Sequence, residues 1–333
     1  MHTLAVHFLE RMQRRFFDYL IISLKGIAMG AADVVPGVSG GTIAFISGIY
    51  EELIESIDKI SLEVFKVWKT QGFKSAWKSI NGNFLLALFS GIAISILSLA
   101  KLIKWLLHNE PILLWSFFFG LVLASILYIA KQIEGWSVKI ILAIIATSIL
   151  SYYITLAEPF ASPESPFYLL FCGFIAIIAM ILPGVSGAFI LLILGAYQTA
   201  IDTVNDLRDG LLQGNMELFK DALLKFFLLA IGAVVGIKVF SKALNWMFKH
   251  QKNLTLAILT GFMIGSLNKI WPWKEVLKTR INSEGEEVTL LDKSILPSSY
   301  DGDNQLIMAI IFIVIGFATI LILESLGKNK TKA

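Results

Sequence analysis

Long apolar runs alternate along the chain with shorter segments in which polar and charged residues gather. A helix needs about 20 apolar residues to cross a membrane, and six runs have this length. They cover residues 84–106, 111–130, 137–157, 222–246, 253–271 and 305–323. Two other apolar stretches, residues 19–50 and 167–201, are too long for one straight span, and a Pro-Gly pair interrupts each of them. We therefore predict that each forms a helical hairpin that re-enters the membrane without crossing it.

The two interrupted stretches share a motif, because the sequence Pro-Gly-Val-Ser-Gly occurs at residues 36–40 and again at residues 183–187. The match continues around the motif at one constant offset. The flanking pairs are Gly26 and Gly173, Gly48 and Gly195, and Tyr50 and Tyr197. After a short gap the match resumes with Gly91 and Gly232, Trp105 and Trp246, and Gly120 and Gly261. Such a duplication is typical of transporters built from two structural repeats, and chance similarity between apolar stretches is the alternative.

The predicted fold is therefore an all-α polytopic membrane protein with an inverted repeat, in which each half is a re-entrant hairpin followed by three transmembrane helices. Residues 1–333 form a single membrane domain. Repeat 1 covers residues 20–157 with its tip at 33–42, and repeat 2 covers residues 167–325 with its tip at 182–188. Three crossings per repeat invert the second repeat relative to the first, so the two tips approach the midplane from opposite faces.

Composition agrees with a membrane protein, since 56% of the 333 residues are hydrophobic and 16% are charged. The mean hydropathy is +0.74, and a soluble domain of this size carries more charge. We expect no cleavable signal peptide, because the first twenty residues lack a compact apolar run followed by small residues. The single cysteine, Cys172, excludes disulfides and cysteine-rich metal sites.

The distribution of basic residues predicts the topology. Segments rich in lysine or arginine fall on one side, and they are the N-terminus, residues 57–81, 131–139 and 247–252, and the C-terminal tail. The other side receives two loops without lysine or arginine and two acid-rich loops, at residues 107–110, 158–166, 202–221 and 272–304. By the positive-inside rule, both termini are cytoplasmic in a multi-pass protein of the plasma membrane. Residues 57–81 combine lysines with apolar residues at helical spacing and are expected to lie in the headgroup layer.

The two tips have the chemistry of an anion site, and phosphate fits it best. Glycine permits left-handed backbone and close approach of a ligand, proline ends the incoming helix, and the outgoing helix directs its positive dipole end at the cavity. The candidate substrate-binding residues of the tips are Pro36, Gly37, Ser39, Gly40, Gly41, Thr42, Pro183, Gly184, Ser186 and Gly187. The alternative is a Pro-Gly kink whose small residues only ease packing against neighbouring helices.

Ionisable residues within the apolar stretches are few, and each is a candidate for function. Asp33 has Met180 as its counterpart in the second repeat, so the hairpin does not require it. Asp33 and Glu51 are candidates for coupling transport to a proton or sodium gradient, and for Asp33 the alternative is a hydrogen bond to loop backbone. Lys238 is the candidate counter-charge for a phosphate, and its alternative is snorkelling to the interface.

An enzyme is not expected. The four histidines are His2, His7, His108 and His250, and all fall in predicted tails or loops. The sequence therefore lacks the histidine nucleophile of a lipid phosphatase and a histidine-rich metal site. It also lacks a Walker phosphate loop. We expect no catalytic residue, no metal, no cofactor and no nucleic-acid partner.

Residues 30–42, Gly-Ala-Ala-Asp-Val-Val-Pro-Gly-Val-Ser-Gly-Gly-Thr, resemble the bacterial and archaeal polyprenyl-phosphate transporter family. Residues 182–187 and 195–197 fit the same resemblance, which extends over residues 20–325. It implies that the chain translocates, or flips, undecaprenyl phosphate or a related polyprenyl phosphate across the plasma membrane, and so recycles the carrier lipid of envelope polymer synthesis. The second motif departs from the first, with Ala188 in place of Gly41 and no acidic residue.

Two other classes of function remain open from the residues alone. A transporter of a small soluble anion would use the same glycine-rich tips. A structural or assembly protein of the membrane would leave the doubled tips unexplained. A lateral opening to lipid between helices distinguishes a lipid carrier from a carrier of soluble anions.

Overall fold

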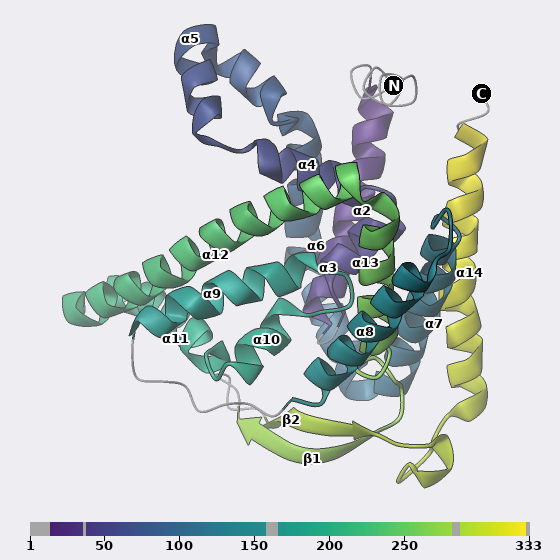
Figure 1. Cartoon of the computed structure of the whole chain (residues 1–333). Helices are drawn as coiled ribbons and strands as arrows, with labels where there is room; N and C mark the ends of the chain where they lie inside the picture. Colours follow the sequence, from purple (N-terminus) through teal and green to yellow (C-terminus); the bar gives the residue numbers. More distant parts are fainter. Residues whose placement is uncertain (1–13, 36–37, 158–165, 282–286, 331–333) are drawn as a thin grey trace.

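The computed structural model describes residues 14–35, 38–157, 166–281 and 287–330, and Figure 1 shows it as a bundle of helices with a small sheet at one end. The helices of the first half are α2 (Phe16–Val34), α3 (Gly40–Ile46), α4 (Tyr50–Lys59), α5 (Leu62–Ser79), α6 (Gly82–Asn109), α7 (Pro111–Ala130) and α8 (Val138–Thr155). Those of the second half are α9 (Pro166–Ile181), α10 (Gly187–Ile193), α11 (Tyr197–Leu212), α12 (Met216–His250), α13 (Lys252–Ser266) and α14 (Leu306–Lys330). Pro36 and Gly37 lie outside the described residues.

Each Pro-Gly motif separates a long helix from a helix of seven residues, α3 in the first half and α10 in the second. A serine begins both short helices, since the Ser39 side chain accepts a hydrogen bond from the Gly41 N–H and that of Ser186 accepts one from the Phe189 N–H. Both short helices are followed by a glycine with positive φ, which lets the chain turn into the next helix. These glycines are Gly48, with φ 73°, and Gly195, with φ 68°.

The long helices pack as pairs whose backbones come into close contact. Helix α2 packs against α6, α9 against α12, α7 against α14, and α8 against α13. A β-carbon added to Gly91 would lie 2.1 Å from the Ser23 carbonyl oxygen, and one added to Gly232 would lie 2.0 Å from that of Leu170. Small residues at such crossings allow the close approach that membrane helices use in place of a hydrophobic driving force.

Four described helices are long and apolar enough to cross a membrane, namely α6, α7, α8 and α12, and the bent pair α10 and α11 raises the number to five. Many large apolar side chains on these helices face outward, including Leu97, Val138 and Val234. Outward-facing apolar side chains on long helices are expected when lipid surrounds the protein. The chain is an integral membrane protein, as its composition predicts.

The structure differs from the sequence prediction at three places. Helix α13 ends at Ser266, short of the predicted end at residue 271, because the chain turns before the segment Trp271-Pro272-Trp273. Residues 202–212, predicted as part of a loop, belong to helix α11. The predicted loop 272–304 contains an antiparallel pair of strands, β1 (Lys274–Ile281) and β2 (Glu287–Ser294), followed by a short helix η1 (Pro297–Ser299).

The two ends of the molecule differ in what they carry. Figure 1 shows helix α5 and the first and last described helices reaching one end, whereas β1 and β2 lie at the opposite end. Helix α12 runs obliquely between them, with α9, α10 and α11 beneath it in this view. The short helix α3 is buried along its whole length, whereas α10 lies below α9 in this view, on the side of the strand pair, and is only partly buried.

Candidate functional site

The two hairpins meet directly, because side chains of the first hydrogen-bond to the backbone of the second. The hydroxyl of Ser39 donates to the Met180 carbonyl at 2.9 Å, and the hydroxyl of the buried Tyr50 donates to the Ile181 carbonyl at 3.1 Å. In the other direction, the Gly184 N–H donates to the Thr42 hydroxyl at 2.9 Å. The last carbonyls of a helix have no partner within the helix, so the first hairpin satisfies the end of α9.

The glycines of the tips are required by contacts with protein atoms. A β-carbon at Gly41 would lie 2.4 Å from the Ile181 carbonyl oxygen, and one at Gly187 would lie 2.8 Å from that of Ala176. Gly184 has φ 86°, in the left-handed region, and its added β-carbon would lie 2.7 Å from the Ser266 hydroxyl. Packing between helices therefore explains the residue type at these positions before any ligand is considered.

A cavity of about 440 Å³ lies beside the tips and brings part of the predicted site together. Its polar lining residues are Asp33, Ser39, Ser186 and Thr203. Gly187 also lines it, and the rest of its wall is apolar or small and comes from Val38, before α3, and from α9, α10, α11 and α12. Among the described residues that line the cavity, none is basic and Asp33 is the only acidic one.

One side of the cavity reaches the outer surface of the helix bundle. Three of its lining residues are large and apolar and are also exposed, with Met180 45% exposed, Val204 58% and Phe226 42%. They come from α9, α11 and α12. The neighbouring outward side chains on α9 and α12 include the apolar Phe171, Leu224 and Phe227, whereas α11 also carries the exposed Arg208 one turn beyond Val204. Exposed large apolar side chains on apolar helices are typical of a surface in contact with lipid.

Asp33 has a hydrogen-bond partner and also lines the cavity. Its Oδ1 accepts a bond of 2.6 Å from the Gly40 N–H, in the first turn of α3. At the other end of α3, the ammonium of Lys25 donates to the Ser47 carbonyl at 2.6 Å. An anion at the N-terminus and a cation at the C-terminus both stabilise a helix. The backbone bond of Asp33 is the alternative role that the sequence left open, and coupling through Asp33 stays a prediction.

Seven of the predicted site residues that the structure describes do not line this cavity. Gly40, Gly41, Thr42, Pro183 and Gly184 belong to the tips beside it, and Lys238 and Glu51 have partners elsewhere. The Lys238 ammonium is 3.6 Å from the Asp58 carboxylate and also donates to the backbone carbonyl of Asp58. Glu51 pairs with Lys252 at 3.1 Å, and both side chains are about half exposed. Neither Lys238 nor Glu51 lines the cavity, and their roles as counter-charge and coupling group stay predictions.

A buried ion pair near the first hairpin has no signal in the sequence. The guanidinium of Arg14 donates two bonds to the Glu52 carboxylate, at 2.6 and 2.7 Å, and the Asn81 amide adds a third at 2.7 Å. Glu52 is buried, whereas its sequence neighbour Glu51 is exposed. Helical periodicity places Glu52 on the face of α4 with Ile49 and Ser56 but does not identify its partner.

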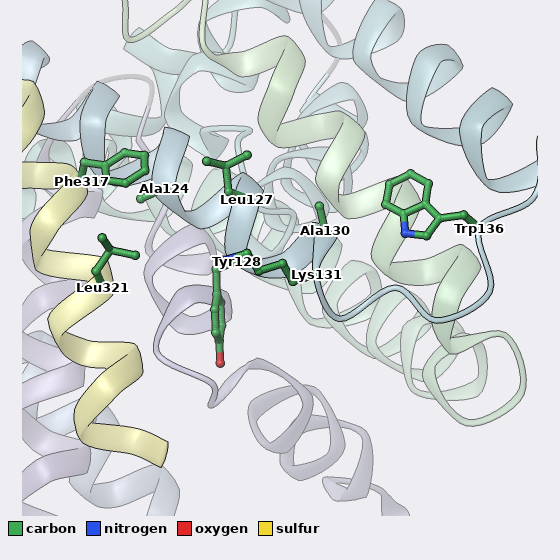
Figure 2. Close-up of a pocket in the computed structure, with 8 residues that line it drawn as sticks. All are labelled: Ala124, Leu127, Tyr128, Ala130, Lys131, Trp136, Phe317 and Leu321. Carbon is green, nitrogen blue, oxygen red and sulfur yellow. The ribbon is translucent and has the colours of Figure 1, made fainter. Parts of the chain in front are cut away.

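A second cavity, of about 490 Å³, lies between the end of α7, the segment after it and α14. Figure 2 shows its lining, which contains no residue of the predicted site. The lining residues are Ala124, Leu127, Tyr128, Ala130, Lys131, Trp136, Phe317 and Leu321. No cluster of potential metal ligands occurs among the described residues.

Known proteins resemble this chain over most of its length. Residues 29–288 match the family model described as undecaprenyl phosphate translocase-like. A protein of Vibrio cholerae named polyprenyl-phosphate transporter is 45% identical over 322 residues, which are 96% of this chain and 100% of that protein. A protein of Staphylococcus aureus with the same name is 31% identical over 261 residues, 75% of this chain and 85% of that protein. No solved structure gives a significant match.

Proposed function

We propose that this chain, which belongs to the undecaprenyl phosphate translocase-like family, flips undecaprenyl phosphate or a related polyprenyl phosphate across the plasma membrane. Flipping returns the carrier lipid to the face where envelope polymer synthesis uses it again. The costly step is the passage of the phosphate, because a charge in hydrocarbon is strongly disfavoured. The polyprenyl tail is soluble in the bilayer and needs no path through the protein.

The observation that carries this proposal is the cavity beside the tips, which combines polar groups inside with an apolar side open to lipid. Ser39 and Ser186 supply hydroxyls, and Met180, Val204 and Phe226 form the exposed apolar side. A phosphate can enter such a cavity while its tail remains in the bilayer. A carrier of small soluble anions gains nothing from a lipid-facing opening, so the cavity favours the lipid.

The hydroxyls of Ser39 and Ser186, one in each tip, differ in their hydrogen-bond partners in this structure. Ser39 already donates its hydroxyl hydrogen to Met180, so it must break that bond before it can bind a phosphate. The Ser186 hydroxyl accepts a bond from the Phe189 N–H, and no described residue accepts the hydrogen of Ser186. Ser186 is therefore the better placed of the two to donate to a phosphate oxygen.

The charges of the cavity argue for coupling to a cation. A phosphate in this cavity would lie near the carboxylate of Asp33, and among the described lining residues no basic side chain offsets the two negative charges. Like charges in one low-dielectric site repel strongly, so the second binds well only when the first is neutralised. We infer that a proton or a sodium ion binds with the phosphate, at or beside Asp33.

Alternating access through an inverted repeat would move the phosphate between the two faces. Both halves have a seven-residue helix begun by a serine, a following glycine with positive φ and close glycine contacts at the next helix pair, which supports two related repeats. The lysine-rich α5 lies at the end reached by the first and last described helices, which supports cytoplasmic termini.

Vesicles containing the purified protein test the proposal. A fluorescent polyprenyl phosphate should move from one leaflet to the other faster than in protein-free vesicles, and a Ser186→Ala variant should slow this movement. Uptake of inorganic phosphate, measured in the same vesicles, should stay at the protein-free level. Uptake of inorganic phosphate without lipid movement would replace the lipid proposal with a soluble-anion carrier.

A further inference from the structure

A buried ionic cluster connects the strand pair to the helices, at the end of the molecule away from α5. It consists of Lys269, just after α13, Lys274, at the start of β1, and Asp292, on β2. The Lys269 ammonium is 2.9 Å from one carboxylate oxygen of Asp292, and the Lys274 ammonium is 3.4 Å from the other. The side chains of Lys269, Lys274 and Asp292 are only 12%, 11% and 16% exposed.

The cluster holds two positive charges and one negative charge. Burial, together with the nearby Lys269, lowers the pKa of Lys274 to about 8, although Asp292 acts in the opposite direction. Burial also opposes ionisation of Asp292, but the two ammonium groups outweigh it and hold the pKa of that carboxyl below its usual range. One carboxylate thus does not compensate two ammonium groups, and an excess positive charge withdrawn from water is unfavourable until an anion approaches it.

Aromatic rings complete the surroundings of both ammonium groups. The Lys274 ammonium lies 4.2 Å from the ring centre of Trp115 on α7 and donates to the Lys269 carbonyl. The Lys269 ammonium lies 4.7 Å from the ring centre of Phe189. Aromatic faces stabilise cations without neutralising them, so both lysines keep their ability to attract an anion.

Phe189 places the cluster next to the cavity. It belongs to the first turn of α10, and its N–H donates to the hydroxyl of Ser186, which lines the cavity. Lys269 therefore contacts the same turn of the second hairpin that presents Ser186. Phe189 thus connects the cluster to Ser186, in the cavity wall of the second tip.

We propose that Lys269 and Lys274 form a docking site for the phosphate monoester headgroup of a lipid, on the face that carries the strand pair. Without the lipid, the Asp292 carboxylate occupies the position that the phosphate takes when it binds. This site rests on the proposed function, since it would receive the substrate before the headgroup reaches the cavity. A phosphate that displaces the Asp292 carboxylate gains two charge-assisted hydrogen bonds, which are among the stronger polar contacts in proteins. The competing explanation is that the three residues only fasten the strand pair to the helices.

The two explanations predict different effects of one substitution on the affinity for an anion. If the cluster binds an anion, Asp292→Asn removes a competitor and should raise the affinity several-fold. If the cluster only fastens the strands, the same change removes an ion pair and should leave the affinity unchanged. The probe is dodecyl phosphate, added to the full-length protein in a neutral detergent, with binding measured by calorimetry.

The lysine variants give the opposite result on the same probe. Lys269→Gln and Lys274→Gln should each weaken dodecyl phosphate binding by roughly tenfold to a hundredfold, as expected for loss of one hydrogen bond to a charged group. Lys293→Gln is the matched control, because Lys293 is an exposed lysine next to Asp292 and should leave the affinity unchanged. Lys269→Arg should retain binding. An elution volume in gel filtration and a melting temperature equal to those of the unmodified protein show that a variant is folded.

Inorganic phosphate separates the two possible sources of the anion. Dodecyl phosphate should bind at least tenfold more tightly than inorganic phosphate if the site receives a lipid. Equal affinities would assign the site to free phosphate and overturn the lipid proposal. Unchanged affinity for dodecyl phosphate in Lys269→Gln and Asp292→Asn, with both variants folded, would overturn the docking site altogether.

Transport in vesicles distinguishes failure of this site from failure of the proposed function. The lysine variants should slow lipid movement only when the labelled lipid starts in the leaflet that faces the strand pair. Ser186→Ala should slow it from both leaflets. No lipid movement with the unmodified protein would reject the proposed function, whereas normal movement in both directions with Lys269→Gln would reject the docking site alone.

Discussion

The carboxylate of Asp33 accepts a 2.6 Å hydrogen bond from the backbone N–H of Gly40, so the first tip already holds an anion of its own. The corresponding position in the second half is Met180, which supplies no such group. The two tips share a motif but differ in charge. A phosphate at the first tip must compete with Asp33 for the Gly40 N–H, whereas the second tip offers Ser186 and has no acidic residue of its own, although Asp33 lines the same cavity.

Replacing Asp33 with asparagine tests the coupling. Asp33→Asn keeps an oxygen that can accept from Gly40, so the hairpin should remain folded, but it removes the negative charge from the cavity. We expect the phosphate lipid to bind at least as tightly as before, and transport in vesicles to lose its dependence on the pH or sodium gradient. An unchanged gradient dependence in a folded variant would leave Asp33 with its structural role only.

The two tip serines should respond differently to removal of the hydroxyl. Ser186→Ala should weaken binding of the phosphate lipid by roughly tenfold to a hundredfold, because one hydrogen bond to a charged group is worth about 1.5–3 kcal/mol. Ser39→Ala should instead lower the stability, since its hydroxyl joins the tips through Met180 and caps α3. The uncharged polyprenol is the control ligand, and equal loss of both ligands in Ser186→Ala would mean that the phosphate binds elsewhere.

The ion pair of Arg14 and Glu52 should be important for stability. Arg14→Met leaves the buried Glu52 carboxylate with the Asn81 amide, at 2.7 Å, as its remaining hydrogen-bond donor among the described residues. Breaking a buried pair from one side costs about 3–5 kcal/mol. Thermal unfolding in detergent should show a clear loss. The double change Arg14→Met and Glu52→Gln should recover part of this loss, and a double variant less stable than Arg14→Met would contradict the explanation.

Lys274 should make the stability depend on pH in the alkaline range. Its pKa is about 8 in the folded protein, whereas an unperturbed lysine has a pKa of 10.5. Between these values the unfolded chain binds more protons, so the free energy of unfolding should rise with pH, by up to about 1.4 kcal/mol per pH unit. Below pH 8 Lys274 is charged in both the folded and the unfolded protein, so the full cost of burying its charge opposes folding. Lys274→Met should remove the rise, whereas Lys293→Met should keep it.

Cysteine labelling checks the topology. A cysteine in place of Lys69, on α5, should react only from the cytoplasmic side of intact cells, and one in place of Asp301, beyond the strand pair, should react only from outside. The native Cys172 is buried and gives a low background. Reaction of position 69 from outside would reject the re-entrant hairpins and the inverted symmetry that depends on them.

The sequence by itself determined that the chain is a helical membrane protein, where most of its long helices lie, and which family it resembles. Lipid requires every backbone group to be paired within its own segment, so an apolar run of about 20 residues is a nearly sufficient signal for a helix. The doubled Pro-Gly motif also marked both breaks, because proline ends a helix and glycine permits the turn that follows.

Only the tertiary structure decided which polar groups meet. Ser39 and Met180 are far apart in the chain, as are Lys269 and Phe189, and no periodicity predicts that they lie in contact. The structure places Lys238 beside Asp58 and not in the lining of the cavity. Apolar patterning depends on the local environment of each helix, whereas a polar site depends on how several helices pack, and that packing is set by the glycine contacts at their crossings.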